Sequence, residues 1–309
     1  MILTITLNAS IDKTVKIENF KVGQINRVDK PIEMAGGKGL NVTRALKSFN
    51  LDSIATGFIG GISGERLRKL LNDDNINHNF YQIEDQTRSC LAIVDHKNQS
   101  ITEINENGPF ISENEIQGLY KKIEEMSSKV KLAVISGSVP RSLSENVYSE
   151  IIKICKNNNV LTILDASGIH LKNGIGAYPY IIKPNQFEAE ELLGFNLISE
   201  EDYFKAINFL THYCQIAVVT LEDNGCIIGT KSEIFHLRPP KVKVINSVGC
   251  GDSFLAGMLY AIFNNLSLEK IGIYGIATGT ANTLTETAGL CNLDDINNIL
   301  KSVEVKKLL

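Results

Sequence analysis

The sequence lacks any dense run of basic residues, and its formal net charge is −4. Both features argue against nucleic-acid binding. It also lacks a segment near the roughly 20 apolar residues that a membrane-spanning helix needs, so no membrane contact is predicted. Its six cysteines include no C-x-x-C pair, and no secretory signal precedes them, because Met1 leads directly into an apolar strand pattern at residues 2–7. We therefore predict reduced thiols and a cytoplasmic location.

Internal repeats and low-complexity tracts are absent as well. The composition, 43% hydrophobic and 21% charged, is that of an ordinary globular protein. A chain of 309 residues can bury a sufficient apolar core without disulfides or a structural metal. We expect residues 1–309 to form a single α/β domain with a small appendage.

Strand and helix patterns alternate after residue 110. Short apolar runs that predict buried strands lie at 131–136, 160–164, 180–183 and 216–221. Apolar residues at helical spacing follow three capping-box patterns, at Ser112 with Glu115, Ser142 with Glu145, and Ser199 with Asp202. Strands separated by helices predict a parallel sheet with helices on both faces.

Two stretches interrupt this alternation, at about 11–34 and 88–105. The first contains an alternating apolar and polar run, and the second predicts a hairpin with strands at 91–95 and 101–105. Neither stretch is followed by a helix that would cover it. We predict that they form a small separate sheet.

A first glycine-rich segment, Gly36-Gly37-Lys38-Gly39, precedes a helix with an apolar face. Glycines at a helix start allow backbone N–H groups to approach an anion, and Lys38 adds a full positive charge. The segment matches neither the P-loop nor the dinucleotide-binding pattern. A tight turn before a packed helix remains an equal alternative at this point.

A second segment, residues 246–253, also opens a helix and contains Gly249-Cys250-Gly251-Asp252. The N–H groups of its last turn could converge on an anion, while Asp252 could accept a proton from an alcohol. The alternative is that Asp252 serves only as an N-cap. A third segment, Thr220 to Gly225, follows a predicted parallel strand, where α/β sheets bind ligands, although a hairpin turn has a similar sequence.

Taken together, the order and spacing of these segments resemble the ribokinase-like carbohydrate kinases of the PfkB family, over essentially the whole chain. Residues 36–42 resemble the family's N-terminal signature, and residues 246–257 resemble its C-terminal signature. Blocks at 136–140, 165–168 and 183–188 resemble its phosphosugar branch, which includes tagatose-6-phosphate kinases and 1-phosphofructokinases. The resemblance implies a three-layer sandwich with a mostly parallel central sheet, and a lid made of the small sheet.

The resemblance also implies a role for each matching residue. Asp252 would be the general base, with Gly249, Cys250 and Gly251 around the transferred phosphoryl group. The sugar and its phosphate would contact Asp12, Arg27, Gly37, Lys38, Asn41, Arg88 and Ser136. The nucleotide, ATP, would contact Lys183, Asn185, Thr220, Glu222, Gly225, Ser247 and Asn282. Asn185 and Glu188 would hold Mg²⁺ through water, since magnesium keeps several waters.

The substrate that this resemblance implies is a phosphorylated sugar. Arg27, Lys38 and Arg88 would bind its dianionic phosphate. Tagatose 6-phosphate is the leading candidate and fructose 1-phosphate the nearest alternative, followed by an unphosphorylated sugar or a nucleoside. A non-catalytic sugar-phosphate sensor is a further alternative, supported only by Glu222 where the family turn normally has glycine. The exposed small sheet also predicts a homodimer, or a lid that closes over the sugar.

Overall fold

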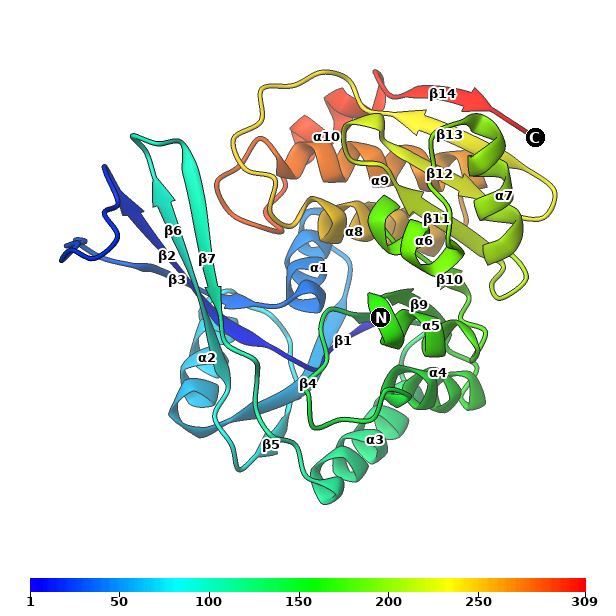
Figure 1. The fold of residues 1–309 in the computed structure, drawn as a ribbon. Helices are drawn as coiled ribbons and strands as arrows, with labels where there is room; N and C mark the ends of the chain where they lie inside the picture. The colour runs from blue at the N-terminus through cyan, green and yellow to red at the C-terminus, as the bar shows by residue number, and fades with distance from the viewer.

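The computed structural model describes residues 1–309 and contains two β-sheets (Figure 1). The large sheet has the strand order β14-β13-β12-β11-β10-β9-β8-β1-β4-β5. Its strands are β1 (Ile2–Thr6), β4 (Ser53–Gly60), β5 (Tyr81–Ile83), β8 (Leu132–Ser136), β9 (Leu161–Asp165), β10 (Ile181–Ile182), β11 (Ile216–Thr220), β12 (Cys226–Gly229), β13 (Ile234–Arg238) and β14 (Glu304–Lys307). The small sheet has the order β3-β2-β6-β7, with β2 (Ser10–Ile17), β3 (Ile32–Gly36), β6 (Arg88–Asp95) and β7 (Ser100–Asn105). The predicted α/β fold with a separate small sheet is confirmed.

The strands from β5 to β11 pair in parallel, and β11 to β14 pair antiparallel. Because β1, β8, β9 and β10 run in the same direction, their carboxyl ends meet at one edge of the sheet. Open α/β sheets bind ligands at this edge.

Helices cover both faces of the large sheet. They are α1 (Lys38–Leu46), α2 (Gly61–Asp73), α3 (Glu113–Ser127), α4 (Val147–Asn157), α5 (Gly168–Ile175), α6 (Gln186–Leu193), α7 (Glu200–Leu210), α8 (Cys250–Phe263), α9 (Leu268–Asn282) and α10 (Leu293–Leu300). One apolar core lies beneath α3 to α7, and a second lies beneath α1, α8, α9 and α10. Alternate residues of β1 enter opposite cores, Leu3 and Ile5 on one side and Ile2 on the other, as expected for a strand covered on both faces.

Capping signals located two of the three predicted helix starts. Ser112 and Ser199 form capping boxes at α3 and α7. The prediction at Ser142 is wrong, because α4 begins at Val147 after the N-cap Asn146. The Ser142 hydroxyl instead accepts a hydrogen bond from the Ile111 N–H at 2.8 Å.

The small sheet extends away from the main body (Figure 1). It contains the predicted hairpin, since β6 and β7 pair antiparallel from Cys90 with Asn105 to Asp95 with Ser100. The expectation that no helix covers it is wrong at one end, where α2 packs Leu67 and Leu71 in one cluster with Ile11 and Ala35. The edge strand β7 is exposed along its whole length.

All six cysteines are unpaired. None of the helices combines the length and the apolar character that crossing a bilayer requires.

Candidate active site

Polar side chains gather at the carboxyl ends of β1, β8 and β9. Four oxygens there are buried without a hydrogen-bond partner: Thr6 Oγ1, Asn8 Oδ1, Ser136 Oγ and Asp165 Oδ2. Buried polar atoms in proteins are nearly always paired. A group of unpaired oxygens at the ligand-binding edge of the sheet is therefore suited to a hydroxyl-rich ligand.

Gly37 brings helix α1 directly over the end of β1. It is the N-cap of the helix with φ of 118°, a conformation that favours glycine. A Cβ atom at this position would lie 2.7 Å from Thr6 Cγ2. The close approach places Lys38 and Asn41, in the first turn of α1, above the strand ends.

Two lysines share one buried carboxylate at the centre of the site. Lys183 Nζ lies 3.2 Å and Lys38 Nζ 3.5 Å from Asp165 Oδ1. Burial acts to raise the pKa of Asp165, but the two ammonium groups outweigh it and hold the pKa below its usual value. Asp165 correspondingly raises the pKa of Lys38, whose side chain is still 41% exposed. Lys38 also interacts with the charges of Asp252 and Glu188. Its partly exposed ammonium is the cation of this group that an anionic ligand can reach.

Asp252 is the third residue of α8 and is only 6% exposed. The N-cap is Gly249, so Asp252 does not cap the helix. Its Oδ2 accepts a hydrogen bond from Asn41 Nδ2 at 2.8 Å. Burial, followed by repulsion from Asp165, raises the pKa of Asp252 to about 6, against the opposing effects of Lys38, Asn41 and Lys183. A carboxylate with this pKa can accept a proton near neutral pH.

The start of α8 also offers hydrogen-bond donors. The N–H groups of Gly251 and Asp252 have no acceptor, while the Cys250 N–H reaches Ser247 O at 3.4 Å. Such free N–H groups at the positive end of a helix bind anions. The structure thus places the buried Asp252 carboxylate and two free N–H groups at the same helix start. The roles that the sequence analysis gave them stay predictions.

The predicted nucleotide residues occupy different environments. Ser247 and Glu222 are exposed, whereas Asn282 is 0% exposed. The Asn282 amide bonds to Val248 O, Ser253 Oγ and the Gly289 N–H. Asn282 therefore holds the 246–253 loop from beneath and has no exposed polar atom of its own.

The third glycine-rich segment is a hairpin turn between β11 and β12. Thr220 ends β11, Glu222 to Asn224 form a single 3-10 turn, and Gly225 follows with φ of 85°. Glu222 itself has φ of 49°, a left-handed conformation that is unusual for a residue with a side chain. The glycine expected at this position would adopt this conformation without strain.

The predicted phosphate clamp is only partly assembled. Arg88 Nε donates to Asn8 O and its Nη1 donates to Glu106 O, both at 3.1 Å, which leaves Nη2 free. Asp12 accepts a hydrogen bond from Ser10 Oγ at 2.6 Å, and burial raises the pKa of Asp12. Arg27 lies exposed in the loop between β2 and β3 and makes no hydrogen bond or ion pair, so no contact holds it near Lys38 or Arg88.

Asn185 and Glu188 form the capping box of α6. Asn185 Oδ1 accepts from the Glu188 N–H at 2.8 Å, and Glu188 Oε2 accepts from the Asn185 N–H at 2.9 Å. One Glu188 oxygen remains uncommitted, and no cluster of three metal-ligating side chains exists. This donor set fits a magnesium ion held largely through water.

Sequence reasoning did not assign roles to several residues of the site. Asp165 ends a buried parallel strand, a position that could have identified it. Arg44 follows Asn41 by three residues on the buried face of α1, where a charged side chain is unusual. Thr6 and Asn8 gave no signal beyond their place at or just after the end of the first strand.

The model of the pfkB family of carbohydrate kinases matches residues 5–295. A tagatose-6-phosphate kinase of Staphylococcus epidermidis is 34% identical over 309 residues, covering 99% of both chains. A 1-phosphofructokinase of Bacillus subtilis is 33% identical over 311 residues, covering 100% of both. Phosphofructokinase-2 from Escherichia coli in complex with fructose-6-phosphate has a TM-score of 0.90 and 27% identity, covering 97% of this chain and 98% of that one.

Proposed function

Because the chain belongs to the pfkB family of carbohydrate kinases, we propose that this sugar-phosphate kinase transfers a phosphoryl group from ATP to the 1-hydroxyl of tagatose 6-phosphate. The products are tagatose 1,6-bisphosphate and ADP. The observation that supports the reaction most directly is the position of Asp252, buried at the start of α8 beside free N–H groups. The nearest alternative is phosphorylation of fructose 1-phosphate at its 6-hydroxyl.

Asp252 acts as the general base in this proposal. Its carboxylate takes the proton of the sugar hydroxyl as that oxygen forms a bond to the γ-phosphorus of ATP and the bond to the ADP oxygen breaks. Asn41 holds the carboxylate through the 2.8 Å hydrogen bond. The pKa of about 6 leaves Asp252 mostly ionised at neutral pH, and therefore able to accept the proton.

The surrounding positive groups stabilise charge on the transferred phosphoryl group. The free N–H groups of Gly251 and Asp252 point from the first turn of α8, and Cys250 and Gly249 shape that turn. Lys183, beside Asp165, contacts the ATP phosphates. Bound Mg²⁺, held through water by Asn185 and Glu188, would neutralise phosphate charge.

Residues on both sheets hold the sugar. Asp12 accepts hydrogen bonds from its hydroxyls, and the Ser136 hydroxyl donates to them or accepts from them. Gly37 and Asn41 line the sugar from the start of α1. Arg88 binds the phosphate through its free Nη2, since its other nitrogens are fixed by backbone carbonyls. Lys38 adds a second cation, and Arg27 contributes only if its loop moves toward the sugar. Thr220, Glu222, Gly225 and Ser247 line the nucleotide, with Asn282 supporting the loop.

The test is a coupled ADP-release assay with purified protein, ATP and Mg²⁺. The acceptors are tagatose 6-phosphate, fructose 1-phosphate, fructose 6-phosphate, unphosphorylated tagatose and a nucleoside. We expect the highest kcat/KM with tagatose 6-phosphate, and phosphorus NMR of the product should show phosphate at both ends of the sugar. A preference for fructose 1-phosphate would establish the alternative. A preference for an unphosphorylated acceptor would contradict both.

A further inference from the structure

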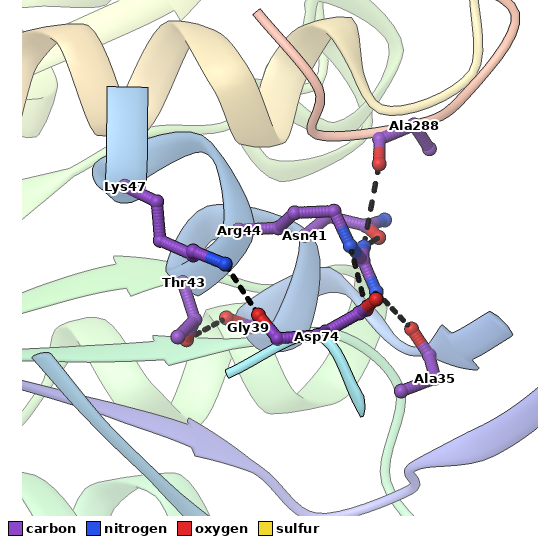
Figure 2. A network of polar contacts seen from close by, with 8 residues as sticks. All are labelled: Ala35, Gly39, Asn41, Thr43, Arg44, Lys47, Asp74 and Ala288. Atoms are coloured by element: carbon purple, nitrogen blue, oxygen red, sulfur yellow. Dashed lines mark hydrogen bonds and ion pairs between the residues drawn. The ribbon is translucent and has the colours of Figure 1, made fainter. Parts of the chain in front are cut away.

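Arg44 is a buried guanidinium that contacts four separate parts of the chain (Figure 2). It lies on α1 and is 7% exposed. Its Nη2 donates to Ala35 O at 2.7 Å, its Nη1 donates to Ala288 O at 3.3 Å, and its Nη2 pairs with Asp74 Oδ2 at 3.3 Å. These three contacts would be sufficient if Arg44 only anchored α1 to neighbouring segments.

The fourth contact connects Arg44 to the proposed base. Arg44 Nη1 donates to Asn41 Oδ1 at 3.1 Å, and Asn41 Nδ2 donates to Asp252 Oδ2 at 2.8 Å. We propose that Arg44 is a positioning residue, which fixes the Asn41 side-chain amide so that its NH₂ group always faces Asp252. The inference rests on the proposed role of Asp252 as the general base.

The hydrogen-bonding capacity of Arg44 and Asn41 determines which atom of the Asn41 amide faces Asp252. A guanidinium can only donate hydrogen bonds, so the Asn41 atom that faces Arg44 must be the carbonyl oxygen. The NH₂ group is then left for the carboxylate of Asp252. Without Arg44, the amide could rotate by half a turn and present its oxygen to Asp252, where two acceptors would repel one another.

Losing this donor should raise the pKa of Asp252, because hydrogen bonds to a carboxylate favour its ionised form. The other charged and titratable groups near Asp252 come from three other elements and from α8 itself. They are Lys38 on α1, Asp165 at the end of β9, Lys183 after β10, and Cys250 on α8. None of these groups contacts Arg44, so its replacement should act on Asp252 through Asn41.

The test compares the pH dependence of kcat/KM for the phosphosugar in wild-type protein and in Arg44→Met. The variant removes all donors but retains a long side chain. We expect the acid limb of the profile to move upward by about half to one pH unit, so that activity falls more at pH 6 than at pH 8. The KM for ATP should stay nearly constant.

Asp74→Asn is the matched control. It weakens the ion pair with Arg44 but leaves the contacts to Asn41, Ala35 and Ala288 in place. We expect a small loss of thermal stability with an unmoved acid limb. A purely structural role of Arg44 would instead lower the melting temperature of Arg44→Met without moving its limb, and that result would overturn the proposal.

Two further variants keep the test decisive. If Arg44→Met does not fold, Arg44→Lys replaces it. The lysine ammonium pairs with Asp74 and leaves Asn41 Oδ1 without a donor. We expect the same upward shift of the acid limb. In an Asn41→Ala background, Arg44→Met should add no further shift, and an additional shift would contradict action through Asn41. Wild-type protein without kinase activity would refute the proposed function, whereas an active enzyme with unshifted variants refutes only the role of Arg44.

Discussion

Burial of Asp252 affects both its reactivity and the stability of the folded protein. With its pKa raised from 3.8 to about 6, the folded protein binds this proton more tightly than the unfolded chain does. The favourable contribution of the protonated group is therefore complete below about pH 4 and disappears as the pH rises through about 6. At neutral pH, the ionised carboxylate lowers the free energy of unfolding by up to about 3 kcal/mol.

Asp252→Asn should consequently lose turnover while gaining stability. The amide has nearly the same shape, but the proton acceptor is gone, which we expect to lower kcat by about 10²- to 10⁴-fold. Steady-state kinetics and thermal unfolding at neutral pH check the two effects. Asp294→Asn, an exposed acid in the first turn of α10, is the control. It should leave turnover unchanged and should not raise the stability. Near wild-type turnover in Asp252→Asn would exclude the general-base role.

A second single residue, Arg88, offers a test of the substrate class. Its free Nη2 is the proposed phosphate donor, and a charge-assisted bond of this kind contributes about 1.5–3 kcal/mol. Arg88→Ala should therefore raise the KM for the phosphosugar by about ten- to a hundredfold, with little change in the KM for ATP. Binding of the unphosphorylated sugar should barely change.

The control for Arg88 is Arg66→Ala, because Arg66 is also an arginine close to the small sheet but pairs with Glu33. It should leave both KM values unchanged. Equal weakening of phosphorylated and unphosphorylated sugars by Arg88→Ala would indicate a structural role. A selective rise in the KM for ATP would mean that the pocket lies at the opposite end of the site.

At the scale of elements, local signals in the sequence located those features that depend on neighbours along the chain. The capping boxes at Ser112 and Ser199 and the hairpin of β6 and β7 are of this kind. Ser142 failed because its hydroxyl is used by Ile111, a residue from another segment. The contact of Arg44 with Ala288 was likewise not predictable, because Ala288 lies 244 positions away in the sequence.

The β11–β12 turn contains a residue whose conformation and charge can be tested separately. Glu222 has φ of 49°, which costs a non-glycine residue about 1 kcal/mol. Glu222→Gly should raise the free energy of unfolding by up to about 1 kcal/mol and lower the KM for ATP by removing a negative charge near its phosphates. Glu222→Gln keeps the backbone strain and should change only the KM. An unchanged KM in both variants would place the Glu222 carboxylate away from the nucleotide.

For the whole molecule, the exposed edge of the small sheet predicts self-association. Ile101 and Ile104 on β7 are 57% and 56% exposed, and an open strand edge of this kind is normally covered. We expect a dimer through the small sheets in light scattering, and Ile104→Lys should shift it toward monomer. Asn105→Lys, exposed on the opposite face of the same strand, controls for added charge. A monomer at all concentrations, with no protection of this sheet on adding sugar phosphate, would contradict both pairing and lid closure.

The hydrogen bond between Asn41 and Asp252 joins residues that are 211 positions apart. At about 5–20 residues per second, a ribosome would deliver them roughly 10–40 s apart. Throughout that interval, the start of α1 would lack its contact with α8. Arg44 on α1 would wait still longer for Ala288, which is 244 positions further along the chain. Arg44 therefore lacks one of its four contacts until Ala288 has been synthesised. Completion of the active site is consequently one of the last events of biosynthesis.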